Sequence, residues 1–166
     1  MLRSFEPVVN EKSLVIILGT MPGVMSLKKR QYYGHDRNMF WRIIYSLFDM
    51  LPDEDYENRK RFLLNSRIAL WDVISSCNRE GSLDSNIKNA KPNDIINLLK
   101  KFPGIKAVFF NGNKAYELYN KMISRDILME YYVLPSTSPA RTLPFEEKLS
   151  EWMLVRKVLD RLSISS

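Results

Sequence analysis

The residues best suited to chemistry follow directly on a buried strand. Residues 14–18 are a continuous aliphatic run, which is typical of a strand covered on both faces of a parallel sheet. Gly19 and Gly23 then permit a tight turn. The polar segment after the turn holds two tyrosines, the chain's single histidine and a basic cluster, Lys28, Lys29 and Arg30. This mixture indicates a ligand-binding loop rather than a simple connection, and it leads into an apolar helix that starts near Asn38.

Polar residues also end or follow the other apolar strands of the chain. Asp72 closes the run at residues 67–72, and Asn111 follows residues 105–110. A segment rich in serine and proline follows residues 131–134, and it contains Ser136, Ser138 and Arg141. In an open α/β sheet the carboxyl ends of parallel strands share one edge, and ligands bind at that edge. We therefore expect these polar residues to meet the loop after residue 18 in one site.

The order of the apolar patterns predicts the fold class. Strands are expected at residues 13–18, 67–72, 105–110 and 131–134, and helices at residues 38–50 and 56–65, from 92 to 102, after 113 and from 144 onward. This alternation favours one α/β domain over residues 1–166, a three-layer α/β/α sandwich around a central, mainly parallel four-stranded sheet. Residues 1–12 are expected to form a lead-in. Residues 75–91 are expected to form a long loop or short helical turns, a kind of segment that is often functional.

Composition excludes several classes of protein. Among the 166 residues no apolar run approaches the roughly 20 that a membrane helix needs, and we see no secretory signal pattern. The single cysteine, Cys77, excludes an internal disulfide and a multi-thiolate zinc site, which favours a reducing cytoplasm. The net charge of +6 and the pI near 9.4 favour a polyanionic partner, because lysine and arginine laid along phosphates release counterions.

Three segments together resemble the motifs of a known family. They are Gly19-Thr-Met-Pro-Gly23 after the first strand, Tyr33-Gly-His-Asp-Arg-Asn-Met-Phe-Trp41, and Leu134-Pro-Ser-Thr-Ser-Pro-Ala140 after the last strand. In this order and strand context they resemble the uracil-DNA glycosylase superfamily, above all its DNA-deoxyinosine (hypoxanthine) glycosylase branch. The resemblance implies a monofunctional DNA glycosylase that needs no metal or cofactor. Such an enzyme extrudes a deaminated base from double-stranded DNA and hydrolyses its N-glycosidic bond.

Two positions depart from the better-known members of this family. Met21 stands where many uracil glycosylases carry an Asp or Asn that holds the attacking water, and Leu134 stands where a histidine opens the last motif. The resemblance leaves Asn38, from the family's Asn-X-Phe-Trp element, as the catalytic residue that positions the water. A purely structural role for Asn38 as a helix N-cap is the alternative. His35 is expected to support the site as a hydrogen-bond partner rather than as the catalytic base.

Four residues are expected to form the base pocket: Gly19, Tyr33, Asp72 and Asn111. The resemblance places the Tyr33 ring against the face of the extruded base, where an aromatic ring stacks well. Hypoxanthine presents an N1–H donor beside its O6 acceptor, so a carboxylate at Asp72 would accept from N1–H while Asn111 or a backbone N–H donates to O6. Adenine presents a bare N1 acceptor, which the carboxylate would repel. The alternatives are that Asp72 only makes a turn and that Tyr33 only anchors its loop.

Contacts with the DNA backbone are expected from six residues: Lys28, Lys29, Arg30, Ser136, Ser138 and Arg141. We also expect Ala140-Arg141 to approach the minor groove and help fill the gap left by the extruded base. The alternatives are a solvated charge cluster for the three basic residues and simple turns for the two serines.

Two further functions stay open at this point. One is a mismatch-specific uracil-DNA glycosylase, because uracil presents a donor–acceptor edge similar to that of hypoxanthine. The other is a non-catalytic, flavodoxin-like module that binds nucleotides or nucleic acid, although the sequence has neither a P-loop nor a G-x-G-x-x-G motif. In each case we expect a monomer.

Overall fold

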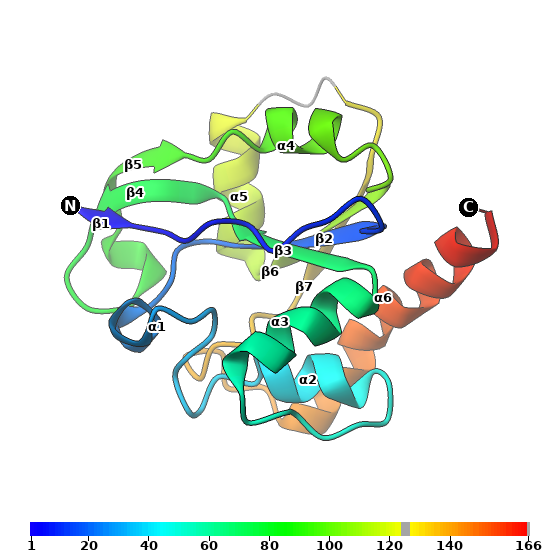
Figure 1. Ribbon diagram of the computed structural model, residues 1–166. Coiled ribbons are helices and arrows are strands. Elements are labelled where there is room, and N and C mark those ends of the chain that lie inside the picture. Colours follow the sequence, from blue (N-terminus) through cyan, green and yellow to red (C-terminus); the bar gives the residue numbers. More distant parts are fainter. Residues whose placement is uncertain (124–126, 166) are drawn as a thin grey trace.

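A four-stranded sheet forms the centre of the computed structural model, which describes residues 1–123 and 127–165 (Figure 1). Its strands are β2 (Val15–Gly19), β3 (Ile68–Asp72), β6 (Ala107–Asn111) and β7 (Glu130–Leu134), in the order β3-β2-β6-β7. All three neighbouring pairs run parallel. The order places β3 and β7 at the outer edges of the sheet. The predicted parallel sheet is confirmed, with strand ends within two residues of those expected.

Helices cover both faces of this sheet because successive strand residues point to opposite sides. Val15 and Ile17 of β2 face one apolar core, which α2 (Phe40–Ser46), α3 (Tyr56–Asn65) and α6 (Phe145–Ser165) complete. Ile16 and Leu18 face a second core, which α4 (Ile95–Lys101) and α5 (Asn113–Met122) complete. Figure 1 shows the resulting three layers, which the sequence predicted.

Aspartates fix the start of two of these helices. Asp55 Oδ1 accepts a hydrogen bond from the Glu57 backbone N–H at 2.9 Å where α3 begins, and Asp94 Oδ1 accepts from the Asn97 N–H at 3.2 Å where α4 begins. Both bonds satisfy donors that the first helical turn leaves without partners. Helix α2 is shorter than the predicted residues 38–50, because the chain leaves the helix after Ser46 and turns at Asp49, whose φ is +56°.

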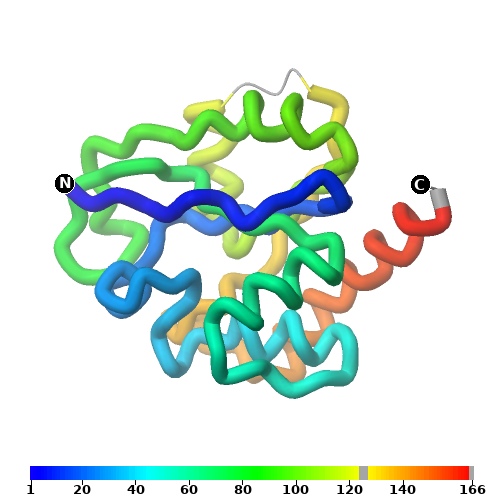
Figure 2. The backbone as a smooth tube through the Cα atoms, viewed as in Figure 1, coloured from blue at the N-terminus to red at the C-terminus, as the bar shows by residue number. Residues whose placement is uncertain are grey.

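A second, antiparallel sheet corrects two expectations from the sequence. It consists of β1 (Leu2–Arg3), β4 (Ile74–Asn78) and β5 (Lys88–Pro92), in the order β1-β4-β5. The expected lead-in thus contains a strand, and the expected loop at residues 75–91 is mostly a hairpin with a short 3-10 turn, η1 (Asp84–Asn86), at its tip. The sequence hid β5 because four of its five residues are exposed and give no apolar alternation. In Figure 2 the N-terminal segment runs beside β4, far from the last turns of α6.

A short helix, α1 (Val24–Lys29), also lies within the stretch that was expected to be a loop. Only Ser26 of its six residues is buried, so the segment lacks the apolar stripe that would have revealed a helix. Across the described ranges, 1–123 and 127–165, no helix is both long and apolar enough to cross a membrane.

Candidate active site

A pocket of about 530 Å³ opens at the carboxyl edge of the parallel sheet. This volume lies within the range of roughly 300–1,000 Å³ that is common for small-molecule sites. Its wall is formed by the last residues of β2, β3 and β6, the segments that follow β2 and β7, and the segment between β4 and β5. Nine of the residues singled out from the sequence line it: Gly19, Tyr33, His35, Asn38, Asp72, Asn111, Ser136, Ser138 and Arg141. The three residues of the basic cluster, Lys28, Lys29 and Arg30, are exposed and lie outside the lining.

The floor of the pocket is formed where the ends of β2 and β3 meet. Gly19 pairs with Asp72 in the parallel register. A Cβ atom at position 19 would lie 2.5 Å from Asp72 Oδ1 and 2.8 Å from the Tyr33 hydroxyl oxygen. Only glycine therefore allows the backbone, the carboxylate and the phenol to come this close together.

Asp72 is a buried acid with unused hydrogen-bonding capacity. Its side chain is part of a residue only 3% exposed, and Oδ2 has no hydrogen-bond partner among the described residues. Burial and, to a smaller extent, the nearby Asp84 carboxylate raise the pKa of Asp72 to about 7, against the opposing effect of the Arg79 guanidinium. A buried acceptor without a partner is costly, so an oxygen kept in this state beside a pocket is suited to a ligand.

Two charged residues near Asp72 were not singled out from the sequence. Asp84 lies in η1 and lines the pocket, and its carboxylate is hydrogen bonded with Thr20. Arg79 donates from Nη2 to the Pro22 carbonyl at 2.6 Å and from Nε to the Gly81 carbonyl at 2.8 Å. The hairpin between β4 and β5 is thereby fastened to the first motif. In the sequence these two residues lie in the polar segment 75–91, and its composition did not indicate which of its side chains would reach the site.

Tyr33 is held in a fixed orientation by its neighbours. Its backbone has φ of +54°, its ring is stacked on Phe40 with centroids 4.0 Å apart, and its hydroxyl accepts from Asn111 Nδ2 at 3.0 Å. Burial raises the pKa of the Tyr33 phenol, and the charge of Asp72 adds to this effect, so the ring stays neutral. The tyrosine thus presents a rigid, flat surface in the pocket.

Both N–H donors of the Asn111 amide are used inside the protein. Nδ2 donates to the Tyr33 hydroxyl and to Thr137 Oγ1, each at 3.0 Å, and Oδ1 accepts from the Thr137 backbone N–H at 2.9 Å. Both N–H donors of the amide are therefore occupied. In this arrangement Asn111 positions Tyr33 and the segment after β7, and donation to a base would require one of these bonds to open.

Asn38 lines the pocket and lies one residue before Met39, which is the N-cap of α2. Its Oδ1 accepts from the Phe40 backbone N–H at 2.9 Å, so Asn38 bonds the first N–H of α2 but is not itself the N-cap considered from the sequence. The Asn38 backbone N–H donates to the His35 carbonyl at 2.9 Å, and the following Met39 N–H donates to the Thr137 carbonyl at 3.0 Å. Asn38 is thereby held between the second and third motifs, with a second lone pair of Oδ1 still available for a water.

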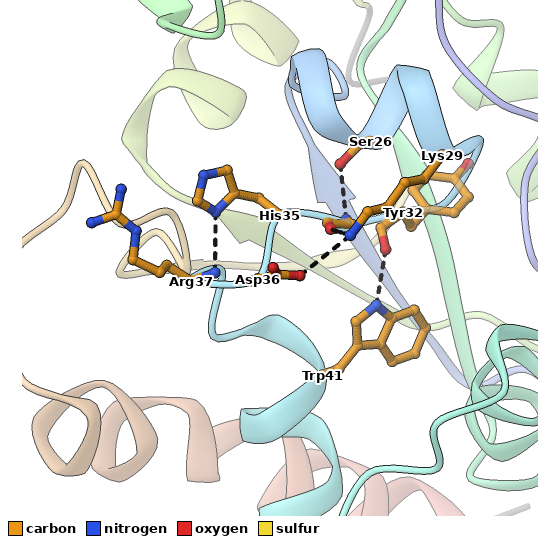
Figure 3. A network of polar contacts seen from close by, with 8 residues as sticks. Ser26, Lys29, Tyr32, His35, Asp36, Arg37 and Trp41 are labelled. Atoms are coloured by element: carbon orange, nitrogen blue, oxygen red, sulfur yellow. Dashed lines mark hydrogen bonds and ion pairs between the residues drawn. The ribbon is translucent and has the colours of Figure 1, made fainter.

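The loop before Asn38 is stabilised by its own polar side chains, as Figure 3 shows. Lys29 donates from Nζ to the Gly34 carbonyl at 2.7 Å and forms an ion pair with Asp36 at 3.3 Å. Ser26 Oγ accepts from the Gly34 N–H, and His35 Nδ1 accepts from the Arg37 N–H at 3.1 Å. His35 thus orients the turn that leads to Asn38, and Lys29 holds the loop in place as well as carrying charge.

The segment after β7 is built from turns and is fastened to α6. Ser136 Oγ accepts from the Ser138 N–H at 3.1 Å, and Ser138 Oγ accepts from the Ala140 N–H at 3.2 Å. Both serines therefore make the turns that the sequence offered as an alternative. Lys148 of α6, which is fully buried, donates from Nζ to the Ser138 carbonyl at 3.1 Å. Arg141 remains exposed at the rim.

This fold and this pocket define a class of protein. A three-layer α/β domain presents, at the carboxyl edge of its sheet, a fixed aromatic ring, a buried acid and an asparagine held at the start of α2, around a cavity for a small ligand. The chain belongs to the uracil DNA glycosylase superfamily, whose family model matches residues 6–162.

Individual relatives agree with this assignment. The chain is 38% identical over 154 residues to a protein named hypoxanthine DNA glycosylase in Methanosarcina acetivorans, covering 92% of this chain and 96% of that protein. A protein of the same name in Methanosarcina barkeri is 37% identical over 151 residues, covering 90% and 94%. A solution NMR structure of a candidate uracil DNA glycosylase from M. acetivorans is 38% identical and superimposes with a TM-score of 0.83, covering 95% of this chain and 98% of that one.

Proposed function

We propose that this protein is a monofunctional DNA glycosylase that removes hypoxanthine from DNA and leaves an abasic site. The observation that carries the proposal is the buried carboxylate of Asp72, whose Oδ2 has no partner, beside a rigid aromatic ring in the pocket. The names of the two Methanosarcina relatives support the choice of base.

Hypoxanthine is matched to Asp72 by the polarity of its edge. The charged carboxylate accepts from N1–H, which supplies the missing partner of Oδ2. The base stacks beside Tyr33, and the Gly19 backbone forms the wall next to it. The two donors of Asn111 are occupied, so O6 is better served by a backbone N–H, and Asn111 acts on the base chiefly through Tyr33.

Asn38 positions the attacking water in this proposal. As the bond from the base to C1′ lengthens, the sugar gains oxocarbenium character and the departing base gains negative charge. The C1′–N bond breaks and its electron pair leaves with the base, the water held by Asn38 Oδ1 adds to C1′, and the proton that this water loses neutralises the departing base. Such a sugar is reactive enough for a weakly activated water, so orientation supplies much of the rate enhancement.

Double-stranded DNA containing a deaminated base is the proposed partner, and the protein acts on it as a cytoplasmic monomer. The basic pI supports a polyanionic partner, and the single buried cysteine supports a reducing compartment. Lys28, Lys29 and Arg30 contact phosphates beside the pocket, and Ser136 and Ser138 do so through the segment after β7. Arg141 at the rim approaches the minor groove next to the extruded nucleotide.

End-labelled duplexes with a single hypoxanthine, uracil or xanthine test the function directly. Alkali cleaves the strand at any abasic product. We expect cleavage at hypoxanthine only after alkali, weaker cleavage at uracil because its N3–H and O4 present a similar edge, and no covalent adduct after borohydride. Release of uracil alone would instead favour a mismatch-specific uracil glycosylase, and release of no base from any duplex would overturn the proposal.

A further inference from the structure

Three large apolar side chains are exposed together at one rim of the pocket. Leu83, which directly precedes η1, is 55% exposed, and Val24 and Met25 at the start of α1 are 48% and 37% exposed. All three line the pocket. Exposed apolar side chains that gather beside a polar site mark a contact surface rather than chance exposure.

The protein holds this apolar rim in a defined position. Ser82 Oγ accepts from the Val24 backbone N–H at 2.9 Å, which joins segments 58 positions apart. Arg79 also joins this hairpin to the first motif through its bond to the Pro22 carbonyl, and its bond to the Gly81 carbonyl lies within the hairpin. Figure 1 shows the β4–β5 hairpin beside α1. Leu83 is therefore kept next to Val24 without being covered.

Charge indicates what kind of partner covers the rim. Val24 and Lys28 are four positions apart in α1, as are Met25 and Lys29, so the two apolar residues that α1 brings to the rim each share a helix face with a cation one turn away. A nucleotide has this same pairing, because its base and deoxyribose offer apolar surface and its phosphate offers negative charge. The rim is thus complementary to a DNA strand.

The order of the sheet places this rim on one side of the pocket and Arg141 on the other. The hairpin follows β3 and is fastened to the motif that follows β2, whereas the segment with Arg141 follows β7 and is bonded to Asn111 of β6. In the order β3-β2-β6-β7 these two pairs of strands form opposite halves of the carboxyl edge. A duplex that delivers a nucleotide into the pocket crosses both halves.

We propose that Leu83, with Val24 and Met25 beside it, packs against the deoxyribose and base of the nucleotide next to the extruded one. Leu83 then acts as a second DNA-contact element, on the side of the pocket away from Arg141, and helps keep the duplex open. This inference rests on the proposed glycosylase function and adds to it a residue that positions the DNA.

Leu83→Ala tests the proposal, with Leu51→Ala as the matched control. Leu51 is also an exposed leucine, but it does not line the pocket. Loss of the side chain that the bound DNA would cover should weaken binding to a duplex with a tetrahydrofuran abasic-site analogue by about tenfold. A 2-aminopurine placed next to that site should brighten less with Leu83→Ala than with the wild type, and Leu83→Met should restore both signals. Melting temperatures of all variants should match the wild type, because the side chain is exposed.

The outcomes separate this inference from the proposed function. If the wild type releases no base, the glycosylase proposal fails whatever Leu83 does. If the wild type is active but Leu83→Ala matches it in affinity for the abasic duplex and in 2-aminopurine fluorescence, the inference is wrong. It is also wrong if Leu51→Ala loses as much affinity and fluorescence as Leu83→Ala. A wild-type dimer that Leu83→Asp dissociates, with DNA affinity unchanged, would assign the rim to a second copy of the chain and also overturn it.

Discussion

Gly19 and Asp72 meet at the ends of β2 and β3, so closely that a Cβ atom at position 19 would stand 2.5 Å from Asp72 Oδ1. The same added Cβ atom would lie 2.8 Å from the Tyr33 hydroxyl oxygen. The first motif therefore needs glycine for the close approach of two side chains. Because Gly19 has no side chain, Asp72 and Tyr33 can both lie against this wall of the pocket.

Gly19→Ala should displace Asp72 and Tyr33 and so misplace the base. A displacement of about 1 Å at a reacting group can lower the rate about 10²-fold, and we expect a loss of that order in single-turnover release of hypoxanthine. Overpacking should also cost about 1–3 kcal/mol of unfolding free energy. A double-mutant cycle supplies the control: the stability cost of Gly19→Ala should shrink when Asp72 is alanine. Equal costs in both backgrounds would mean that Asp72 is not the group displaced.

Asn38→Ala should affect chemistry more than stability. The water loses its acceptor, so the single-turnover rate should fall about 10²-fold or more, with little change in affinity for an abasic duplex. The lost bond to the first N–H of α2 should lower the unfolding free energy by about 1 kcal/mol. Asp55→Ala likewise removes an Oδ1 that accepts from the backbone N–H two residues on, at the start of α3 and away from the pocket. If Asn38→Ala keeps the wild-type rate and resembles Asp55→Ala in stability alone, its role is structural.

Strands β2, β3 and β6 could be predicted because each is a mostly buried apolar run, and β7 because it is rich in aromatic and β-branched residues. The second sheet could not, because β5 is polar and exposed. The location of the site followed from the strand ends, which explains why Asp72 and Asn111 were expected there. The partners of Asn111 depend on where the segment after β7 folds back, and no local pattern encodes that. Lys148 was missed for a related reason: a lysine in an amphipathic helix is expected to be exposed, whereas here it is buried under Ser138.

Binding to DNA should depend steeply on salt and on the basic cluster. Each phosphate contact that is removed should lower the slope of log affinity against log salt concentration by about one. We expect this for Lys28→Ala but not for Lys100→Ala, which removes an exposed lysine of α4 outside the pocket lining. Arg141→Ala should in addition reduce 2-aminopurine brightening next to the abasic site. If Lys28→Ala leaves the slope of log affinity against log salt concentration unchanged, Lys28 does not contact a phosphate of the DNA.

Lys148 should position the DNA-facing segment through the Ser138 carbonyl. Burial lowers the pKa of the Lys148 ammonium, with a smaller contribution from Arg141. Keeping the charged ammonium buried therefore lowers the stability of the folded state. Lys148→Met fills the same space but cannot donate, and the turns at Ser136–Ser138 should loosen. We expect about tenfold weaker binding to abasic duplex with a melting temperature close to that of the wild type. Lys157→Met, at an exposed position of the same helix, should change neither quantity.

The raised pKa of Asp72 should appear in the stability of the protein. Burial and Asp84 raise this pKa from 3.8 to about 7, against the effect of Arg79. The folded state therefore holds the proton more tightly than the unfolded state. The stabilising effect is full below about pH 4 and is lost as the pH rises through 7. Relative to Asp72→Asn, the wild type should lose unfolding free energy between these pH values in denaturant titrations. If the plots of unfolding free energy against pH run parallel for the two proteins, Asp72 does not titrate in this window.

The same titration should change which base is accepted. Above pH 7 the Asp72 carboxylate can only accept, so it binds the N1–H of hypoxanthine and repels the bare N1 of adenine. Below pH 7 the protonated acid can donate to N1 of adenine while accepting from its amino group, and selectivity against adenine should fall. Asp72→Asn carries donor and acceptor at every pH, so its selectivity should be low and independent of pH. The measurement is the ratio of single-turnover rates for hypoxanthine and adenine duplexes from pH 5.5 to 8.5. A ratio that is constant for the wild type, or unchanged in Asp72→Asn, would assign base reading to the backbone around Gly19 instead.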